Sequence, residues 1–185
     1  MRAGWVLGVV AVLGSEARAE ERATTITVGG LGVMQEGPDS ESIIDTASGM
    51  RVTLAWEDAP LPYPDRRGYN VGVALVPELI AGGLIHDDRA EALIGAGLRA
   101  ELRISQREGG LLRINCKSAI YVAARGMVIG ENRDVLTEVV FGDYIYLGSP
   151  LRLGFEVGVT KRHVDQMDLD PTGMMVGFYL GWAPR

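Results

Sequence analysis

The sequence predicts an all-β protein, an antiparallel up-and-down transmembrane β-barrel of eight strands, and three observations lead to this prediction. Apolar residues alternate with small or charged ones along most of the chain after residue 19, which is the period of two of a strand with two chemically different faces. Glycine accounts for 25 of the 185 residues without any collagen-like repeat. The mean hydropathy of +0.12 is high for a chain with 23% charged residues, which indicates that apolar side chains also cover an outer surface.

The first 19 residues are typical of a secretory signal peptide. Met1 and Arg2 form a short positive region, residues 5–13 are apolar, and Ala17-Arg18-Ala19 fits the small-x-small pattern of a cleavage site. The apolar stretch is too short to cross about 30 Å of hydrocarbon as a helix, and no later stretch has 18 uninterrupted apolar residues. We therefore predict a signal peptide at 1–19 and one outer-membrane β-barrel domain at 20–185.

Eight segments carry the strand pattern. Segment 151–160 shows it most clearly, because every odd position is apolar and every even position is small or polar. Segments of about 10 alternating residues, separated by turns, are typical of transmembrane barrels. The other seven predicted strands are 174–183, 112–125, 92–105, 50–57, 69–79, 24–34 and 135–147.

Two of these segments are irregular. In 24–34 the alternation changes phase across Gly29-Gly30, which predicts a β-bulge. In 135–147 the apolar face is interrupted by Asp143, for which the sequence leaves open a second bulge or a position at the rim of the membrane.

The second face of the strands mixes glycine and alanine with charges of both signs. A soluble barrel would turn its polar face to water and would carry little glycine there. An eight-stranded barrel has room inside only for side chains, and charges buried there must be neutralised. We therefore expect this face to point inward, the apolar face to meet lipid, and the sheet to close, because an open edge is costly in hydrocarbon. The predicted interior ion-pair network comprises Glu57, Glu78, Arg99, Glu101, Arg103, Arg113, Lys117, Arg125, Glu138, Arg152 and Glu156, with Arg51 on the same face.

This charged interior is expected to form a closed ion-pair plug, and the alternative is a narrow, porin-like pore. With the N-terminus of the chain in the periplasm, 106–110 and 148–150 are short periplasmic turns, and 35–49 and 161–173 are long external loops. The connection 58–68 is long for a periplasmic turn, and 130–134 is short for an external loop. Aromatic residues at the periplasmic strand ends resemble an interfacial belt, namely Trp56, Tyr69, Tyr146 and Trp182.

The chain resembles the small bacterial outer-membrane β-barrels of the outer-membrane protein A and X type. In the final strand Phe178, Leu180 and Trp182 alternate toward the terminus, like the C-terminal signal that the barrel assembly machinery reads in that group. The chain departs from the group by continuing through Ala183-Pro184-Arg185. The resemblance implies a monomeric protein of a Gram-negative outer membrane, folded by that machinery and surrounded by outer-membrane lipids, lipopolysaccharide among them.

A narrower resemblance is to the lipid A deacylase barrels, whose catalytic His and Ser lie in an H-x-S-N stretch. The corresponding stretch here is His163-Val164-Asp165-Gln166. Because Asp165 stands where the nucleophilic Ser is expected, no acyl-enzyme nucleophile is present for a histidine base to activate. No deacylase activity is carried over to this chain.

Both histidines fall in predicted external loops, each followed by aspartates. One hypothesis is that the two clusters meet at the rim and bind a divalent cation or activate water as an acid-base pair. Ordinary polar loops are the alternative that we favour, because His and Asp are common there. The candidates for catalysis are His163, Asp165 and His86, and those for a metal are Asp87, Asp88, Asp168 and Asp170.

Charge and cysteine content exclude other classes of protein. With 18 Lys+Arg against 24 Asp+Glu and a net charge of -6, the chain has no basic footprint for nucleic acid. The single cysteine, Cys116, rules out an internal disulfide, and its side chain is expected to serve as a small hydrophobic group. Basic residues near the external rim are either solvated or in contact with lipopolysaccharide phosphates, and these are Arg89, Arg133, Lys161 and Arg162.

The predicted function is that of an integral outer-membrane barrel, not catalytic and without a cofactor, which has a structural or surface-interaction role through its external loops. One alternative is a barrel enzyme, a hydrolase that acts at the outer leaflet. A second alternative is a soluble secreted β-barrel that binds a small apolar ligand.

Overall fold

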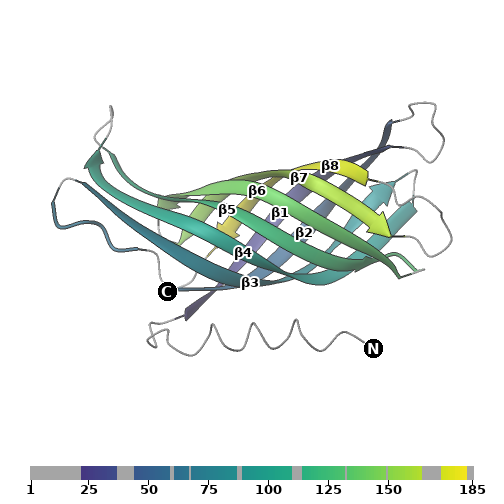
Figure 1. The fold of residues 1–185 in the computed structure, drawn as a ribbon, viewed down its shortest axis with the longest axis horizontal. Coiled ribbons are helices and arrows are strands. Elements are labelled where there is room, and N and C mark those ends of the chain that lie inside the picture. The colour runs from purple at the N-terminus through teal and green to yellow at the C-terminus, as the bar shows by residue number, and fades with distance from the viewer. Residues whose placement is uncertain are drawn as a thin grey trace.

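The computed structural model is a closed β-barrel, and it describes residues 22–36, 44–58, 61–66, 68–86, 89–109, 114–131, 133–148, 150–163 and 172–182. Each strand pairs antiparallel with its neighbours in sequence, and β1 closes the sheet against β8 (Figure 1). The predicted eight-stranded, all-β, up-and-down barrel is therefore confirmed. The strands are β1 (Arg22–Glu36), β2 (Ile44–Asp58), β3 (Gly68–His86), β4 (Arg89–Gly109), β5 (Ile114–Ile129), β6 (Asp134–Gly148), β7 (Leu151–His163) and β8 (Thr172–Trp182).

The barrel has two different ends. We call the end where β1 begins and β8 finishes the terminal end, which lies to the left in Figure 1. The opposite end, where β1 passes to β2 and β7 to β8, is the loop end. The predicted signal peptide at 1–19 lies outside the described residues. Among the residues that the structure describes, no helix is long and apolar enough to cross a membrane.

The strand register fixes the tilt of the strands. A path that steps from each residue to its paired partner leads from Trp182 of β8 to Ile26 of β1 and onward once around the barrel. It passes Thr137 and Lys161 and returns to β8 at Thr172, ten residues from where it began. A stagger of this size over eight strands gives a tilt of roughly 40°, so the full stagger raises the chain by about 25 Å along the barrel axis. With this value, the register gives the relative height along the barrel axis of residues on different strands.

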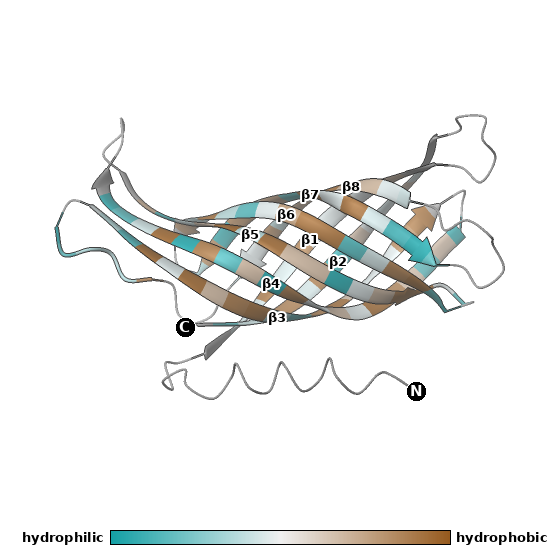
Figure 2. Ribbon diagram, viewed as in Figure 1, coloured by the Kyte–Doolittle hydropathy of each residue, from teal (hydrophilic) through white to brown (hydrophobic). Residues whose placement is uncertain are grey.

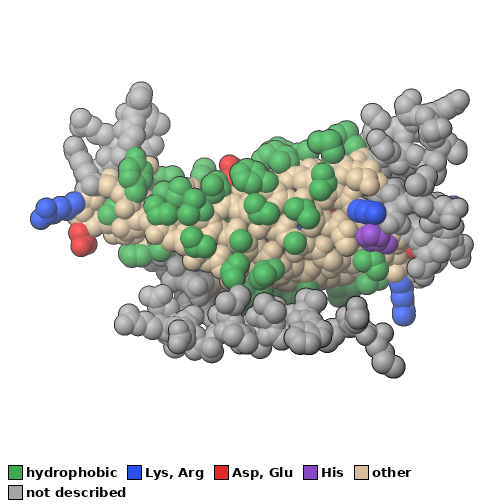
Figure 3. Space-filling view, viewed as in Figure 1, with side chains coloured by type: hydrophobic (Ala, Val, Ile, Leu, Met, Phe, Trp, Pro, Cys, Tyr) green, Lys and Arg blue, Asp and Glu red, His purple; other side chains and the backbone are tan. Residues whose placement is uncertain are grey.

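Burial alternates along every strand, as the sequence predicts. In β8 the side chains of Met174, Val176 and Phe178 are exposed, whereas Met175 and Gly177 between them are buried. Figure 2 shows the same alternation of hydrophobic and hydrophilic residues along the ribbons. In Figure 3 hydrophobic side chains cover the barrel wall, and the basic side chains in view lie near its two ends. The wall is therefore apolar on its outer side.

The β-bulge predicted at Gly29-Gly30 is wrong. β1 pairs with β2 residue by residue from Arg22 to Glu36 without a shift. Leu31 and Val33 are buried inside the barrel, because the interior near the loop end is itself apolar. What looked like a change of phase in the sequence is therefore a change in the interior from polar to apolar.

Asp143 lies in a regular part of β6 and not at a bulge. The β5–β6 register is continuous on both sides of it, and its side chain is exposed on the outer face. By the register it lies about 4 Å farther toward the loop end than Trp182. Of the two explanations left open by the sequence, the bulge is excluded, and Asp143 lies near the terminal edge of the apolar wall.

Candidate functional site in the barrel interior

Among the residues that the structure describes, ten buried charged side chains fill the terminal and middle parts of the barrel interior. Their charges cancel, because five are arginines and five are glutamates. Each of the ten residues has at most 7% of its surface exposed. They are Arg51, Arg99, Arg103, Arg125, Arg152, Glu57, Glu78, Glu101, Glu138 and Glu156.

Arg99 is the centre of this network. Its guanidinium contacts the carboxylates of Glu57, Glu78 and Glu101, the last two at 2.9 and 2.6 Å. Glu101 follows Arg99 by two residues on β4 and therefore lies on the same inward face. Arg103, two residues further along β4, contacts the second oxygen of Glu101 at 2.6 Å. Alternation alone thus places a row of opposite charges along one strand.

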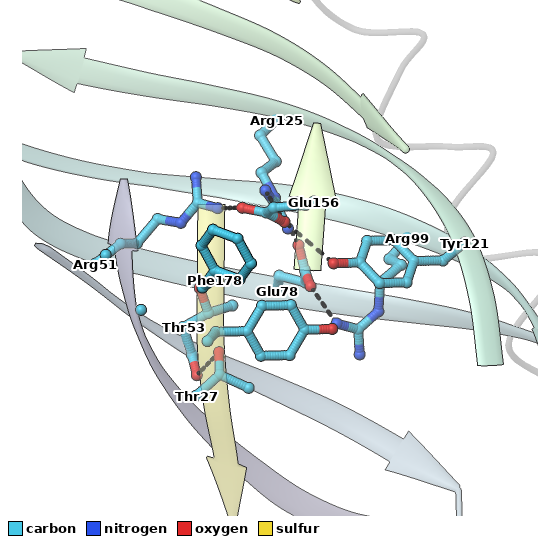
Figure 4. A pocket seen from close by; sticks show the side chains of 12 residues that line it. Thr27, Arg51, Thr53, Glu78, Arg99, Tyr121, Arg125, Glu156 and Phe178 are labelled. Carbon is cyan, nitrogen blue, oxygen red and sulfur yellow. Dashed lines mark hydrogen bonds and ion pairs between the residues drawn. The ribbon is translucent and has the colours of Figure 1, made fainter. Parts of the chain in front are cut away.

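The row extends sideways to the neighbouring strands. Arg125 on β5 contacts Glu78 and Glu156, both at 3.0 Å, so it bridges β3 and β7 across the interior. Arg51 on β2 contacts Glu156 as well as Glu138 of β6, the latter at 2.9 Å. Figure 4 shows Arg51, Glu78, Arg125 and Glu156 converging from different strands. A network that spans the interior in this way leaves its charges paired where water is scarce.

Arg152 closes the network toward the terminal end. Its Nη1 donates to both carboxylate oxygens of Glu57, at 2.7 and 2.8 Å. Its guanidinium also lies 4.5 Å from the ring centre of Tyr144, within the range of a cation–π contact. Arg152 is fully buried, so all of its favourable interactions are made within the barrel.

Tyrosines and glycines complete the interior. The hydroxyl of Tyr121 donates to Glu156 at 3.1 Å, and that of Tyr144 donates to Glu101 at 3.1 Å. A side chain in place of Gly142 would collide with the ring of Tyr121, and one in place of Gly154 would collide with the ring of Tyr179. Part of the glycine excess therefore has a packing reason, since glycine makes room for large polar side chains in a narrow interior.

Little space remains among the charges. One cavity of about 20 Å³ lies between Arg51, Arg99 and Tyr121 (Figure 4), and another of about 10 Å³ lies next to Arg103 and Leu61. A single water needs roughly 10–15 Å³ on this measure, whereas small-molecule pockets are usually of about 300 Å³ or more. These two cavities can hold about one water each and are far too small for a ligand.

An apolar layer and then a second ion-pair cluster follow toward the loop end. The buried apolar side chains there include Leu31, Leu93 and Met127. Beyond them Arg162 contacts Glu91 at 2.8 Å and Asp134 at 2.7 Å. Sequence reasoning missed this layer, although apolar residues on the polar parity, such as Met175, were its signal. Next to this cluster an open depression of about 650 Å³ is lined by Arg89, Ala90, Glu91, Ala92, Gly130 and Glu131.

The connection between β2 and β3 covers the terminal mouth. Leu61 lies against Gly72 on the inner side of β3, and Asn70 donates from its side chain to the Pro62 carbonyl at 3.0 Å. Arg107 of β4 donates to the carbonyls of Pro64 and Asp65, at 3.2 Å each. This connection is too long for a simple turn. Its length is explained by the structure, because residues 61–66 close the mouth.

Two members of the predicted network lie elsewhere. Lys117 lies at the terminal mouth, where its ammonium is 4.6 Å from the ring centre of Tyr63. Arg113 is outside the described residues. Of the four predicted belt aromatics, Trp56, Tyr69 and Trp182 are exposed on the outer face. Tyr146 instead points inward, with its ring 5.6 Å from that of Tyr144, because it shares the parity of the interior residues.

Most of the candidate rim residues lie outside the described part of the chain, so the hypothesis of a rim site stays a prediction. His163 follows Lys161 on the outward parity of β7, and its Nε2 lies 3.5 Å from the hydroxyl of Thr137. The backbone of His86 ends β3, which lies on the opposite side of the closed barrel from β7. Among the described residues no group of three or more His, Cys, Asp or Glu is placed to hold a metal ion. The side chain of His86 and all of Asp87, Asp88, Asp165, Asp168 and Asp170 lie outside the described residues.

The fold and interior define the class: a closed eight-stranded barrel with a neutral ion-pair interior and an apolar outer wall. No protein-family model matches the chain, and no curated protein matches it.

Replacing Arg152 with Leu should strongly destabilise the barrel. Glu57 would lose one of its two arginine partners in a buried site, and removing one partner of a buried pair typically costs about 3–5 kcal/mol. The double variant Arg152→Leu, Glu57→Leu should recover a large part of this loss, since no unpaired carboxylate remains. Urea unfolding of the refolded protein in lipid vesicles measures both effects. Equal stability of the wild type and the Arg152→Leu variant would contradict the role of this pair.

The filled interior also predicts that the barrel does not conduct ions. Purified protein inserted into planar lipid bilayers should give no current above the lipid background, while a large porin in the same bilayers serves as the positive control. Discrete channel openings that depend on the presence of this protein would show that the ion pairs separate and that the interior is a pore.

Proposed function

We propose that the protein is an integral outer-membrane β-barrel of a Gram-negative bacterium, with a structural or surface-interaction role rather than a catalytic one. The observation that supports this best is the inverted distribution of its side chains. Large apolar side chains are exposed on the outward face of every strand, while ten charged side chains are buried inside and paired. A protein in water has no reason to expose so continuous an apolar wall, whereas lipid favours one.

The dimensions of the apolar wall support the proposal. Trp182 and Trp56 lie at nearly the same height by the register, within about 1 Å. Lys161, the first charged outward residue on β7, lies about 22 Å higher. The outward residues of β7 between these levels, from Leu153 to Val159, are all apolar. An apolar band about 25 Å tall with aromatic residues at its edge is expected of an outer-membrane barrel.

The orientation follows from this proposal. The terminal end faces the periplasm, as the aromatic border and the short β4–β5 and β6–β7 connections at that end favour, and the loop end faces the outside. Export would depend on the predicted signal peptide at 1–19, and insertion on the barrel assembly machinery, with the folded protein a monomer in outer-membrane lipid.

The loop end offers surfaces for interaction. The charged depression beside Arg89 and Glu131 opens at this end. Lys161 is exposed and points outward at the edge of the apolar band, at the level where phosphate groups of lipopolysaccharide would lie. Arg162 is turned inward and paired with Glu91 and Asp134. Of the basic residues considered from the sequence, Lys161 is thus better placed than Arg162 to contact a lipid phosphate.

The membrane proposal predicts a heat-dependent mobility on a denaturing gel. A closed barrel held by interstrand hydrogen bonds resists detergent until it is boiled, so unboiled and boiled samples should run at different positions. The protein should also partition with the detergent phase. A control variant, Val157→Asp, places a charge in the middle of the apolar band and should lower the yield of the heat-sensitive form, because charges facing lipid are costly.

A protein that stays in the aqueous phase and runs identically before and after boiling would contradict the membrane proposal. That result would favour a soluble barrel.

A further inference from the structure

The seam between β2 and β3 is unusually short. These two strands are paired only from Ser48 with Ile85 to Ala55 with Glu78. On its other side β3 remains paired with β4 from Gly68 to His86. The ten residues 68–77 therefore form a sheet edge on the side of β3 that faces β2.

Proline explains where the seam ends. Pro77 is the first residue of β3 beyond the last pair with β2, and proline has no N–H to donate to a ladder. The described part of the connection between β2 and β3, residues 61–66, does not pair with this edge either. Residues 61–66 include Pro62 and Pro64 and lie toward the inner side of β3, and among the described residues no backbone hydrogen bond joins them to β3.

This edge lies below the apolar band. From the register, Leu75 is at the height of Trp182, and Tyr69 lies about 15 Å farther out at the terminal end. The outward side chains of the projecting part are nevertheless apolar and highly exposed: Tyr69 at 63%, Val71 at 62% and Val73 at 79%. A row of apolar side chains beside an unpaired edge is a typical site for strand addition.

Lipid and a second copy of the chain do not fit this edge. Lipid chains would end about where Leu75 lies and offer no partners for backbone N–H and C=O groups. Two barrels inserted in the same direction would bring their β3 strands together crossed at roughly 80°, twice the strand tilt, so they cannot form a ladder. Antiparallel pairing of the two edges would require one barrel to be inverted.

The charge around the edge favours one kind of partner. The described charged side chains at this mouth are Arg66, Arg107 and Lys117, with Asp65 as the single acid. An extended segment with acidic residues is therefore attracted more than a basic one.

We propose that the β3 edge, residues 68–76, binds an extended acidic segment of a periplasmic protein as an added strand. The apolar residues of that segment alternate so that they continue the face of Tyr69, Val71 and Val73. This proposal rests on the membrane proposal above, because that proposal places the terminal end in the periplasm.

The backbone geometry identifies the amides that would bind. Pro77 is accommodated inside the β3–β4 ladder, which requires its missing N–H to be on the side away from β4. Because N–H groups alternate in direction along a strand, the N–H groups of Val71, Val73 and Leu75 point to the open edge. Those of Gly72, Ala74 and Val76 point to β4 and are already bonded.

Amide hydrogen exchange on the labelled barrel in lipid nanodiscs tests the proposal. The probe is the peptide acetyl-Glu-Val-Thr-Val-Glu-Val-Thr-Val-Glu-amide, and its counterpart has Lys in place of each Glu. The acidic peptide should slow exchange at Val71, Val73 and Leu75 at least tenfold and leave Gly72 and Ala74 unchanged. The basic peptide should bind at least tenfold more weakly. Unchanged exchange at these three amides with the acidic peptide would overturn the docking edge, and equal binding of both peptides would overturn its preference for acidic segments.

Two variants separate the edge from a general effect of charge. Val73→Pro removes an edge N–H without touching the β4 ladder, and Val73→Asp adds a repelling charge to the outward face without changing the backbone. Each should weaken binding of the acidic peptide at least tenfold. Ser118→Asp, at a similar height on the outward face of β5 and away from the edge, should change it less than twofold, and equal losses in Val73→Asp and Ser118→Asp would overturn the proposal. Each sample is first checked for the change in gel mobility on boiling. If the wild type did not show this change, the result would count against the membrane proposal and not against the docking edge.

Discussion

The neutral set of ion pairs inside the barrel is the interaction on which the rest of the structure depends. Five arginines and five glutamates occupy a space with room for about one water in each of its cavities. Without mutual pairing, each of these charges would carry a desolvation cost of several kcal/mol. Because Arg99, Arg125 and Arg152 each join residues of different strands, the same contacts that neutralise charge also hold the wall together from inside.

The composition follows from this arrangement. A narrow interior that holds arginines and tyrosines needs positions without a side chain next to these large groups. Gly142 supplies such a position beneath Tyr121, and Gly154 supplies one beneath Tyr179. The hydrophobic residues that an ordinary core would use are then free to face outward. Above the charges, the apolar layer and the cluster of Arg162 narrow the loop end, and residues 61–66 cover the terminal end. The barrel is closed at both ends by different chemistry.

Alternation in the sequence predicted the number of strands, their order and the facing of most side chains, because parity is a local property. Segment 151–160 became β7, and the charged positions on its even parity are buried as predicted. What parity cannot supply is height along the barrel axis, which depends on register between strands. For this reason Leu31 and Val33 looked like a phase shift, Tyr146 looked like a belt residue, and Asp143 had no certain place. The end of the β2–β3 seam at Pro77 and the covering role of Leu61 both arise because β2 pairs with only part of β3. No local pattern in the sequence predicts how far two strands remain paired.

Depth-dependent quenching of tryptophan fluorescence tests the inverted barrel most directly. After removal of residues 1–19, Trp56 and Trp182 are the only two tryptophans, and the register places them at one level at the edge of the apolar band. In vesicles of brominated lipids, bromines near the headgroups should quench both tryptophans more strongly than bromines near the chain ends, and single variants Trp56→Phe and Trp182→Phe should show the same depth. If none of these brominated lipids quenched the tryptophan fluorescence, that result would contradict an outer wall in contact with the membrane.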